Sequence, residues 1–229
     1  VRNGEIPEEA VNKKVRNILK LMIRLDLIGQ VPYDTTGMAA KLAIPAHTKA
    51  AREIAEESLV LLKNSKDMLP LDPAQYKNVA VIGANATEVF AAGGGSTKLK
   101  AKYEVTPLEG LQNLLDGKAR IEYAPGYQLS KKAYKVGHWF YIGGTSHEHG
   151  SDCEGYDKPN LKLPYQQDRL LKGILEVNPN TVVVLISGGP VEIGEWYNDA
   201  TALLHGSFLG MEGGNALART LFGAVNPSG

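Results

Sequence analysis

The sequence predicts an α/β fold in which a mostly parallel sheet is sandwiched between helices. Two short, continuous apolar runs, at Asn78–Gly83 and Thr181–Ser187, carry this prediction, because strands buried on both faces of a parallel sheet have this character. Segments with helical spacing of apolar residues alternate with such runs along the chain. That alternation is typical of β–α–β connections.

Length and composition limit the classes of protein to which this chain can belong. The 229 residues are 43% hydrophobic, which is enough for a sizeable core. The 25 Lys and Arg balance 25 Asp and Glu, so the net charge favours neither nucleic acid nor a membrane surface as a partner. One cysteine, Cys153, excludes a disulfide framework within the chain. The chain begins at Val1 without an initiator methionine and ends at Gly229 after a turn sequence, so we interpret it as an excerpt of a longer protein.

The first residues predict one helix and a linker. Pro7 followed by two glutamates marks a helix start. Apolar residues then recur at helical spacing as far as Leu25, and Gly29 is the expected stop. Residues 30–45 contain two prolines and little periodicity, which predicts a linker that crosses between domains.

The rest of the chain divides into alternating elements. A second helix is predicted from Thr48 through Asn64, with an inward side made of Ile54, Ala55, Leu59, Leu61 and Leu62. After the strand at Asn78–Gly83, the expected elements are a helix at Pro107–Leu115, a strand at Arg120–Ala124, a strand at Trp139–Ile142, a helix at Tyr165–Val177, the strand at Thr181–Ser187, a strand at Ala202–Leu204 and a helix from Gly213 to Phe222.

Three stretches that follow predicted strands are candidates for a binding site. They are the glycine cluster Gly93–Gly95 with Ser96, the polar run Gly144–Pro164 and the turn Gly188–Pro190. In open α/β sheets, ligands bind outside the carboxyl ends of the strands. We therefore expect these stretches to lie along one edge of the sheet.

The polar run contains residues of two further kinds of candidate site, a metal site and a cysteine nucleophile. His147 and His149, with Glu148 or Asp152, have a spacing that a metal site could use, but a solvated polar loop is the favoured interpretation because no third ligand is specified. Cys153 is more often a packed or bystander thiol than a nucleophile. A Glu in a polar loop is usually a solvated carboxylate, and composition does not distinguish a catalytic Glu in this run.

The glycine cluster is a weak candidate for a phosphate-binding loop. A Walker loop requires Gly-Lys-Ser/Thr at the start of a helix, whereas the order here is Gly95-Ser96-Thr97-Lys98. A loop whose backbone closely approaches a neighbouring surface is the favoured interpretation.

Several separate stretches, in order, resemble the second domain of glycoside hydrolase family 3, an α/β sandwich. They are AREIAEESLVLLKNSKDMLPL, VAVIGANA, GGGSTK, TPLEGL, CEGYDKPNLKLP, NPNTVVVLISGGPVEI and GMEGGNALARTLFGAVNPSG. The resemblance covers nearly the whole chain. Lys158 stands where the family more usually has arginine.

The resemblance implies a division of the chain and of the active site. Residues 1–45 correspond to the tail helix of a preceding (β/α)8 barrel and an interdomain linker. Residues 46–229 correspond to the sandwich domain, with residues expected to be missing around 130–143 and at the C-terminus. In this family the barrel supplies an Asp nucleophile, and the sandwich domain often supplies a Glu as general acid/base. By motif position that Glu is Glu154.

The implied function is part of a retaining exo-β-glycosidase, first of all a β-glucosidase, that acts without a metal or other cofactor. Its expected partners are a β-linked oligosaccharide or glycoside and the N-terminal barrel; a homodimer and the cellular compartment stay open. The residues expected to bind substrate or support the loop are His147, Glu148, Asp157, Lys158 and Ser96. Alternatives are a β-xylosidase, an N-acetyl-β-glucosaminidase and a non-catalytic carbohydrate-binding or scaffold module.

Overall fold

The computed structural model describes residues 1, 3–29, 36–92, 96, 99–126, 138–145, 152 and 158–228. The chain divides into two compact units, Val1–Leu42 and Ala43–Gly229. No helix within the described ranges combines the length and the apolar character that crossing a membrane requires.

The first unit contains the predicted N-terminal helix. Helix α1 (Glu8–Arg24) has two glutamates in its first turn and Arg24 in its last, which complements the helix dipole. It ends before the expected stop at Gly29. No residue of α1 is buried, and Ile18 is 60% exposed. Such an amphipathic helix gains most of its stability by packing its apolar face against a partner. A short helix, α2 (Met38–Lys41), follows.

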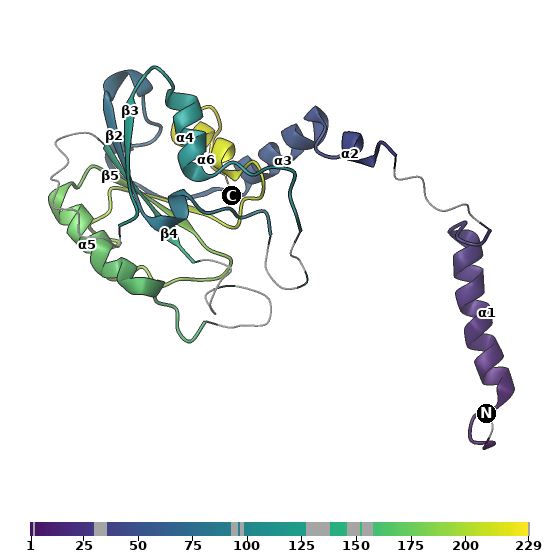
Figure 1. The fold of residues 1–229 in the computed structure, drawn as a ribbon. Coiled ribbons are helices and arrows are strands. Elements are labelled where there is room, and N and C mark those ends of the chain that lie inside the picture. Colours follow the sequence, from purple (N-terminus) through teal and green to yellow (C-terminus); the bar gives the residue numbers. More distant parts are fainter. Residues whose placement is uncertain are drawn as a thin grey trace. The chain divides into compact units, whose positions relative to one another are not determined.

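Six strands of the second unit form one sheet in the order β1-β6-β5-β4-β2-β3 (Figure 1). The strands are β1 (Val60–Asn64), β2 (Asn78–Ile82), β3 (Arg120–Ala124), β4 (His138–Gly144), β5 (Thr181–Ile186) and β6 (Ala202–Gly206). Every neighbouring pair is parallel except β1 with β6. The predicted mostly parallel sheet is therefore confirmed.

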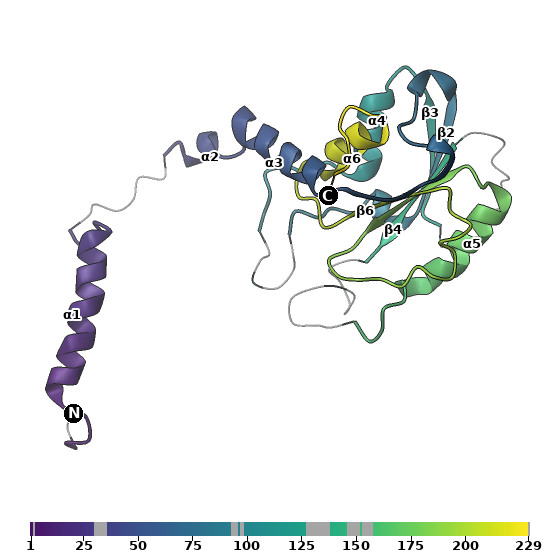
Figure 2. The ribbon, with the colours of Figure 1, turned by 180° about the vertical axis from the view of Figure 1, so that it is seen from behind.

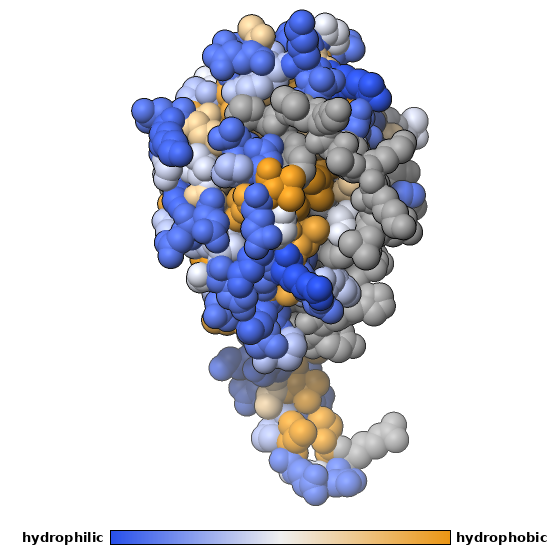
Figure 3. All heavy atoms as spheres, turned by 90° about the vertical axis from the view of Figure 1, so that its left-hand side faces the viewer, coloured by the Kyte–Doolittle hydropathy of each residue, from blue (hydrophilic) through white to orange (hydrophobic). Residues whose placement is uncertain are grey.

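Helices cover both faces of the sheet (Figures 1 and 2). Helix α5 (Gln167–Val177) lies on one face, while α3 (Pro45–Glu57), α4 (Pro107–Leu115) and α6 (Gly213–Leu221) lie on the other. Strand β5 shows how the two cores arise, because Val182 and Val184 join the cluster under α4 and α6, whereas Val183 joins the cluster under α5. On the side shown in Figure 3, many of the described side chains are hydrophilic, and hydrophobic ones gather near the middle.

The second predicted helix was wrong in its second half. Helix α3 ends at Glu57, and Val60–Asn64 instead forms the antiparallel edge strand β1. Ile54 and Leu62, expected to face inward, are 70% and 45% exposed. A short apolar run after a helix does not reveal its period, and its pairing with β6 decides the matter. Asn64 then closes the strand, since its side chain accepts from and donates to the backbone of Leu69.

Strand β4 occupies the centre of the sheet, where the sequence was hardest to interpret. It pairs with β2 on one side and with β5 on the other, so the six strands make one continuous sheet. The expectation of missing residues near 130–143 falls largely on 127–137, which lie outside the described residues.

Candidate active site

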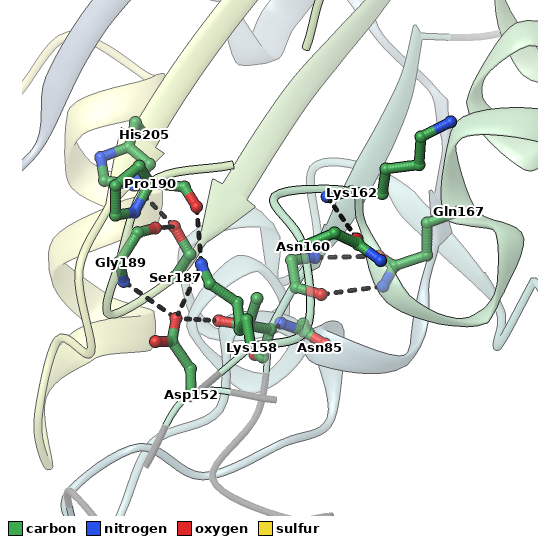
Figure 4. Close-up of polar contacts among 12 residues, drawn as sticks. Asn85, Asp152, Lys158, Asn160, Lys162, Gln167, Ser187, Gly189, Pro190 and His205 are labelled. Atoms are coloured by element: carbon green, nitrogen blue, oxygen red, sulfur yellow. Dashed lines mark hydrogen bonds and ion pairs between the residues drawn. The ribbon is translucent and has the colours of Figure 1, made fainter. Parts of the chain in front are cut away.

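The carboxyl ends of β2, β4, β5 and β6 open onto one edge of the sheet. The 3₁₀ turn η3 (Ala84–Ala86) follows β2, Thr145 follows β4, the turn Ser187–Pro190 follows β5, and Phe208 follows β6. Hydrogen bonds connect Thr145 and the turn after β5 to Asp152 and Lys158 of the polar run, and Asn85 of η3 donates to the carbonyl of Thr145 (Figure 4). The edge predicted from the sequence therefore does gather the turn after β5 and the described residues Thr145, Asp152 and Lys158 of the polar run.

The predicted site residues divide into two groups. Glu154, His147, Glu148 and Asp157 lie outside the described residues. So do His149, Cys153 and the glycine cluster Gly93–Gly95, whereas Asp152, the alternative metal ligand, is described. Lys158 and Ser96 are described: Lys158 is anchored to the turn after β5, and Ser96 is an exposed residue of a short turn.

Thr145 connects three strand ends with the polar run. Its backbone N–H donates to Ile186 of β5 at 3.0 Å, and its carbonyl accepts from the Asn85 side chain at 3.0 Å. Its hydroxyl donates to Asp152 Oδ2 at 2.7 Å. Thr145 is only 1% exposed. The preceding Gly144 has φ +136°, and a Cβ there would lie 1.9 Å from the carbonyl oxygen of Ile186, so only glycine permits this bend.

Asp152 is a carboxylate already engaged by protein groups. Besides the Thr145 hydroxyl, its Oδ2 accepts from the backbone N–H of Gly189 at 2.9 Å, and Lys158 Nζ lies 3.8 Å away. The Asp152 side chain is 16% exposed. A carboxylate that accepts several hydrogen bonds holds structure in place, and Asp152 therefore connects Thr145 after β4 with the turn after β5.

Side-chain contacts stabilise the turn after β5. Ser187 Oγ donates to the carbonyl of Gly189 at 2.9 Å and lies 3.0 Å from Nε2 of His205 on β6. These two contacts attach the turn after β5 to strand β6.

The pKa of His205 leads to a prediction for stability. Burial lowers this pKa from its usual value of 6.5, because the charged imidazolium is poorly solvated there. The folded chain then binds fewer protons than the unfolded chain, so this contribution to stability is complete above pH 6.5 and is lost as the pH falls through the lowered pKa. In urea unfolding of the chain, the loss of stability from about pH 7.5 to about pH 5.5 should be smaller for His205→Gln than for the wild type. Equal losses in the two proteins would contradict this prediction.

Gln167 is a buried residue whose role sequence reasoning missed. It begins α5 and is 1% exposed. Its side-chain carbonyl accepts from the N–H of Gly144 at 2.9 Å and from the Tyr141 hydroxyl at 2.6 Å, while its amide donates to the Gly144 carbonyl at 2.8 Å. Gln167 thus stabilises the end of β4, from which the polar run departs. Gln167 is one of four consecutive polar residues, Gln166–Arg169, and the sequence does not distinguish it from its neighbours.

The segment around the glycine cluster is also tied down on both sides. Glu104 accepts from the backbone N–H of Ala91 at 2.8 Å. Tyr103 donates to Glu212, a carboxylate only 3% exposed, at 2.6 Å, and this hydrogen bond is the main cause that raises the pKa of Tyr103. Phe90 stacks on Phe208 with ring centroids 5.5 Å apart. The described residues before and after the cluster are therefore fixed to the unit.

Comparison with known proteins matches this chain to one domain of a protein family. The model for the "Glycosyl hydrolase family 3 C-terminal domain" matches residues 59–229. The chain is 33% identical over 258 residues to "Beta-glucosidase BoGH3A" of Bacteroides ovatus and 32% identical over 242 residues to "Thermostable beta-glucosidase B" of Acetivibrio thermocellus. A "Beta-xylosidase" of Formosa agariphila is 30% identical over 237 residues.

These matches cover the whole of this chain or nearly so, but only 33%, 30% and 32% of the respective relatives. Among solved structures, a β-glucosidase from Erythrobacter marinus superposes with a TM-score of 0.85 at 25% identity, over 99% of this chain and 35% of the other. A family 3 β-glucosidase from Bifidobacterium adolescentis gives a TM-score of 0.77 at 28% identity, over 99% and 33%. The chain thus spans about a third of the length of the proteins it resembles.

Proposed function

This chain belongs to glycosyl hydrolase family 3, and on that premise we propose that it is part of a retaining exo-β-glycosidase, a β-glucosidase, that hydrolyses terminal non-reducing β-linked sugars. The observation that carries the proposal is the match of the entire chain to relatives named β-glucosidase. In this proposal residues 1–45 are the tail helix of an N-terminal barrel and a linker, and residues 46–229 are the sandwich domain.

The chemistry requires two carboxyl groups, of which this chain supplies one. A retaining glycosidase uses carboxyls about 5–5.5 Å apart, one to attack the anomeric carbon and one to protonate the leaving oxygen and then activate water. We assign the second role to Glu154 and the first to an Asp of the barrel. Asp152 is unsuited to either role, because its described contacts commit it to Thr145 and Gly189.

The anchoring of the polar run supports this assignment. Asp152 and Lys158 stand on either side of residues 153–157, and both are attached to the carboxyl edge of the sheet, where ligands of open α/β folds bind. A general acid must be held within reach of the scissile bond, and a rigid attachment of this kind serves that need. His147, Glu148, Asp157 and Ser96 are proposed to contact substrate or support the loop.

A β-xylosidase is the second candidate, and one observation favours it: a relative with 30% identity is named a β-xylosidase. N-acetyl-β-glucosaminidase and a non-catalytic carbohydrate-binding module are the remaining alternatives. The three enzyme candidates share the proposed double displacement. The stereochemistry of the product therefore tests the reaction mechanism, and a panel of aryl glycosides identifies which sugar is released.

The experiment uses the parent, which is the full-length protein of which this chain is proposed to be a part. Its hydrolysis of an aryl β-glucoside is monitored by NMR from the first turnover. Retention predicts that the β-anomer of glucose appears first and that the α-anomer forms later by mutarotation. The 229-residue chain alone should release no sugar, because it lacks the proposed nucleophile. Early release of the α-anomer would contradict the mechanism. Release of xylose in preference to glucose would select the β-xylosidase, and a parent that binds sugar without hydrolysing it would select the non-catalytic module.

A further inference from the structure

We propose that Asp152 and Lys158 form a positioning pair, which attaches both ends of residues 153–157 to the turn after β5 and thereby sets the rate of the chemical step. The inference rests on the proposed function, since it assigns Glu154 within that segment. Neither residue of the pair is proposed to contact substrate.

The two side chains converge on consecutive residues of the same turn. Asp152 Oδ2 accepts from the backbone N–H of Gly189 at 2.9 Å, and Lys158 Nζ donates to the carbonyl of Pro190 at 2.6 Å. Figure 4 shows both reaching this turn from the polar run. Although 37 positions separate Asp152 from Gly189, the turn is the common anchor of both ends of the segment.

Gly189 is shaped to admit both side chains. A Cβ built there would lie 3.2 Å from Asp152 Oδ1 and 3.3 Å from Lys158 Nζ. These separations are tighter than ordinary van der Waals contact, so a side chain at this position would require Asp152 or Lys158 to shift by a few tenths of an ångström. The absence of a side chain therefore lets the carboxylate and the ammonium group approach one surface together.

Burial makes the pair sensitive to the loss of either partner. The side chains of Asp152 and Lys158 are 16% and 12% exposed, and Oδ2 and Nζ are 3.8 Å apart. Removing one member of a largely buried pair leaves the other charge poorly compensated. An exposed pair nearby, Lys162 with Glu195, is 3.5 Å apart with side chains 60% and 43% exposed, and such surface pairs contribute little.

The turn that receives the pair is itself held by side chains. Ser187 Oγ donates to the carbonyl of Gly189 and lies 3.0 Å from His205 Nε2, and Asp152 also accepts from the hydroxyl of buried Thr145. The anchor is therefore built from β4, β5 and β6 at once. A rigid support of this kind positions a reacting group, because misplacement by about 1 Å can cost about 100-fold in rate.

The test uses the full-length parent with four single variants: Asp152→Asn, Lys158→Met, Lys158→Arg and the control Lys162→Met. Each is assayed on a cellobiose-type substrate, whose leaving group needs protonation, and on a dinitrophenyl β-glucoside, whose leaving group does not. Asp152→Asn and Lys158→Met should lower kcat on the first substrate by about 10- to 100-fold with KM little changed. On the second substrate they should lower kcat/KM, which reports formation of the glycosyl-enzyme, far less than on the first.

Two comparisons separate positioning from general damage. Lys158→Arg should retain most of the activity, since a guanidinium keeps both the charge and a donor for Pro190, and Lys162→Met should match the wild type. The double variant Asp152→Asn/Lys158→Met should lose no more than the worse single variant, because both act through one anchor.

Three results would overturn the inference while leaving the proposed function intact: wild-type kcat in both single variants on the cellobiose-type substrate, equal losses of kcat/KM on the two substrates, or additive losses in the double variant. Failure of Lys158→Arg to fold or to act would overturn it as well. A wild-type parent inactive on both substrates would instead reject the proposed function, so the two failures are distinguishable.

Discussion

Replacing Glu154 with alanine in the full-length parent should lower turnover of a cellobiose-type substrate by about 10²- to 10⁴-fold, the usual contribution of a general acid/base. The loss should be much smaller for formation of the glycosyl-enzyme from a dinitrophenyl β-glucoside, because that leaving group departs without a proton. Added azide should then restore turnover and yield the β-glycosyl azide, since azide attacks the intermediate without needing a general base. Steady-state kinetics and NMR of the product measure both effects.

Glu148→Ala is the matched control, because Glu148 is the other glutamate of the same polar run. It should show neither the dependence on the leaving group nor rescue by azide. If Glu148→Ala shows both and Glu154→Ala shows neither, the acid/base assignment moves to Glu148. If neither variant differs from the wild type, neither glutamate of this run is the acid/base.

Replacing Gly110 with alanine should destabilise the chain by at least about 3 kcal/mol, at the upper end of the cost of overpacking. Gly110 lies where α4 crosses α6, and an added Cβ would stand 2.0 Å from the carbonyl oxygen of Gly214. A Cβ at Gly214 would in turn lie 2.0 Å from the carbonyl of Thr106. Backbone faces backbone in both directions, so one methyl group forces the helices apart. Urea unfolding followed by circular dichroism measures the change.

Gly173→Ala is the control, since Gly173 also lies within a helix, α5, yet nothing lies within 4 Å of its added Cβ. Alanine there should stabilise the chain by about 0.5–1 kcal/mol, because glycine loses more backbone entropy in a helix. Opposite signs at the two positions would show that close packing, not helix propensity, dominates at Gly110. Similar changes in stability at both positions would contradict the close approach of α4 and α6 at Gly110.

Elements with strong local signals were predictable. Helix α4 begins with a capping box, in which Thr106 accepts from the N–H of Glu109 and the Glu109 side chain accepts from the N–H of Thr106, and both residues and the intervening proline are visible in the sequence. Strand β5 was equally clear, since all six of its residues are apolar or β-branched and all are buried. Such signals lie within a few residues of each other, so no knowledge of the fold is needed.

Strand β1 shows where local signals fail. Its apolar residues suit a helix or a strand, and the choice depends on hydrogen bonds to β6, from Val60 with His205 to Asn64 with Ala202. Those partners lie far away in the chain. Pairing energy that is available only in the assembled sheet overrides the helical tendency of the preceding segment.

The sequence by itself determined the family, the alternation of helices and strands, and the polar run as the place to look for chemistry. Only the tertiary structure decided how that run is held: Asp152 on Gly189, Lys158 on Pro190, and Gln167 on the end of β4. The physical reason is that a side chain's hydrogen-bonding capacity can be read from its identity, whereas its partner is chosen by packing. In this chain the parallel sheet brings the ends of β4, β5 and β6 to one edge, and that edge supplies the partners.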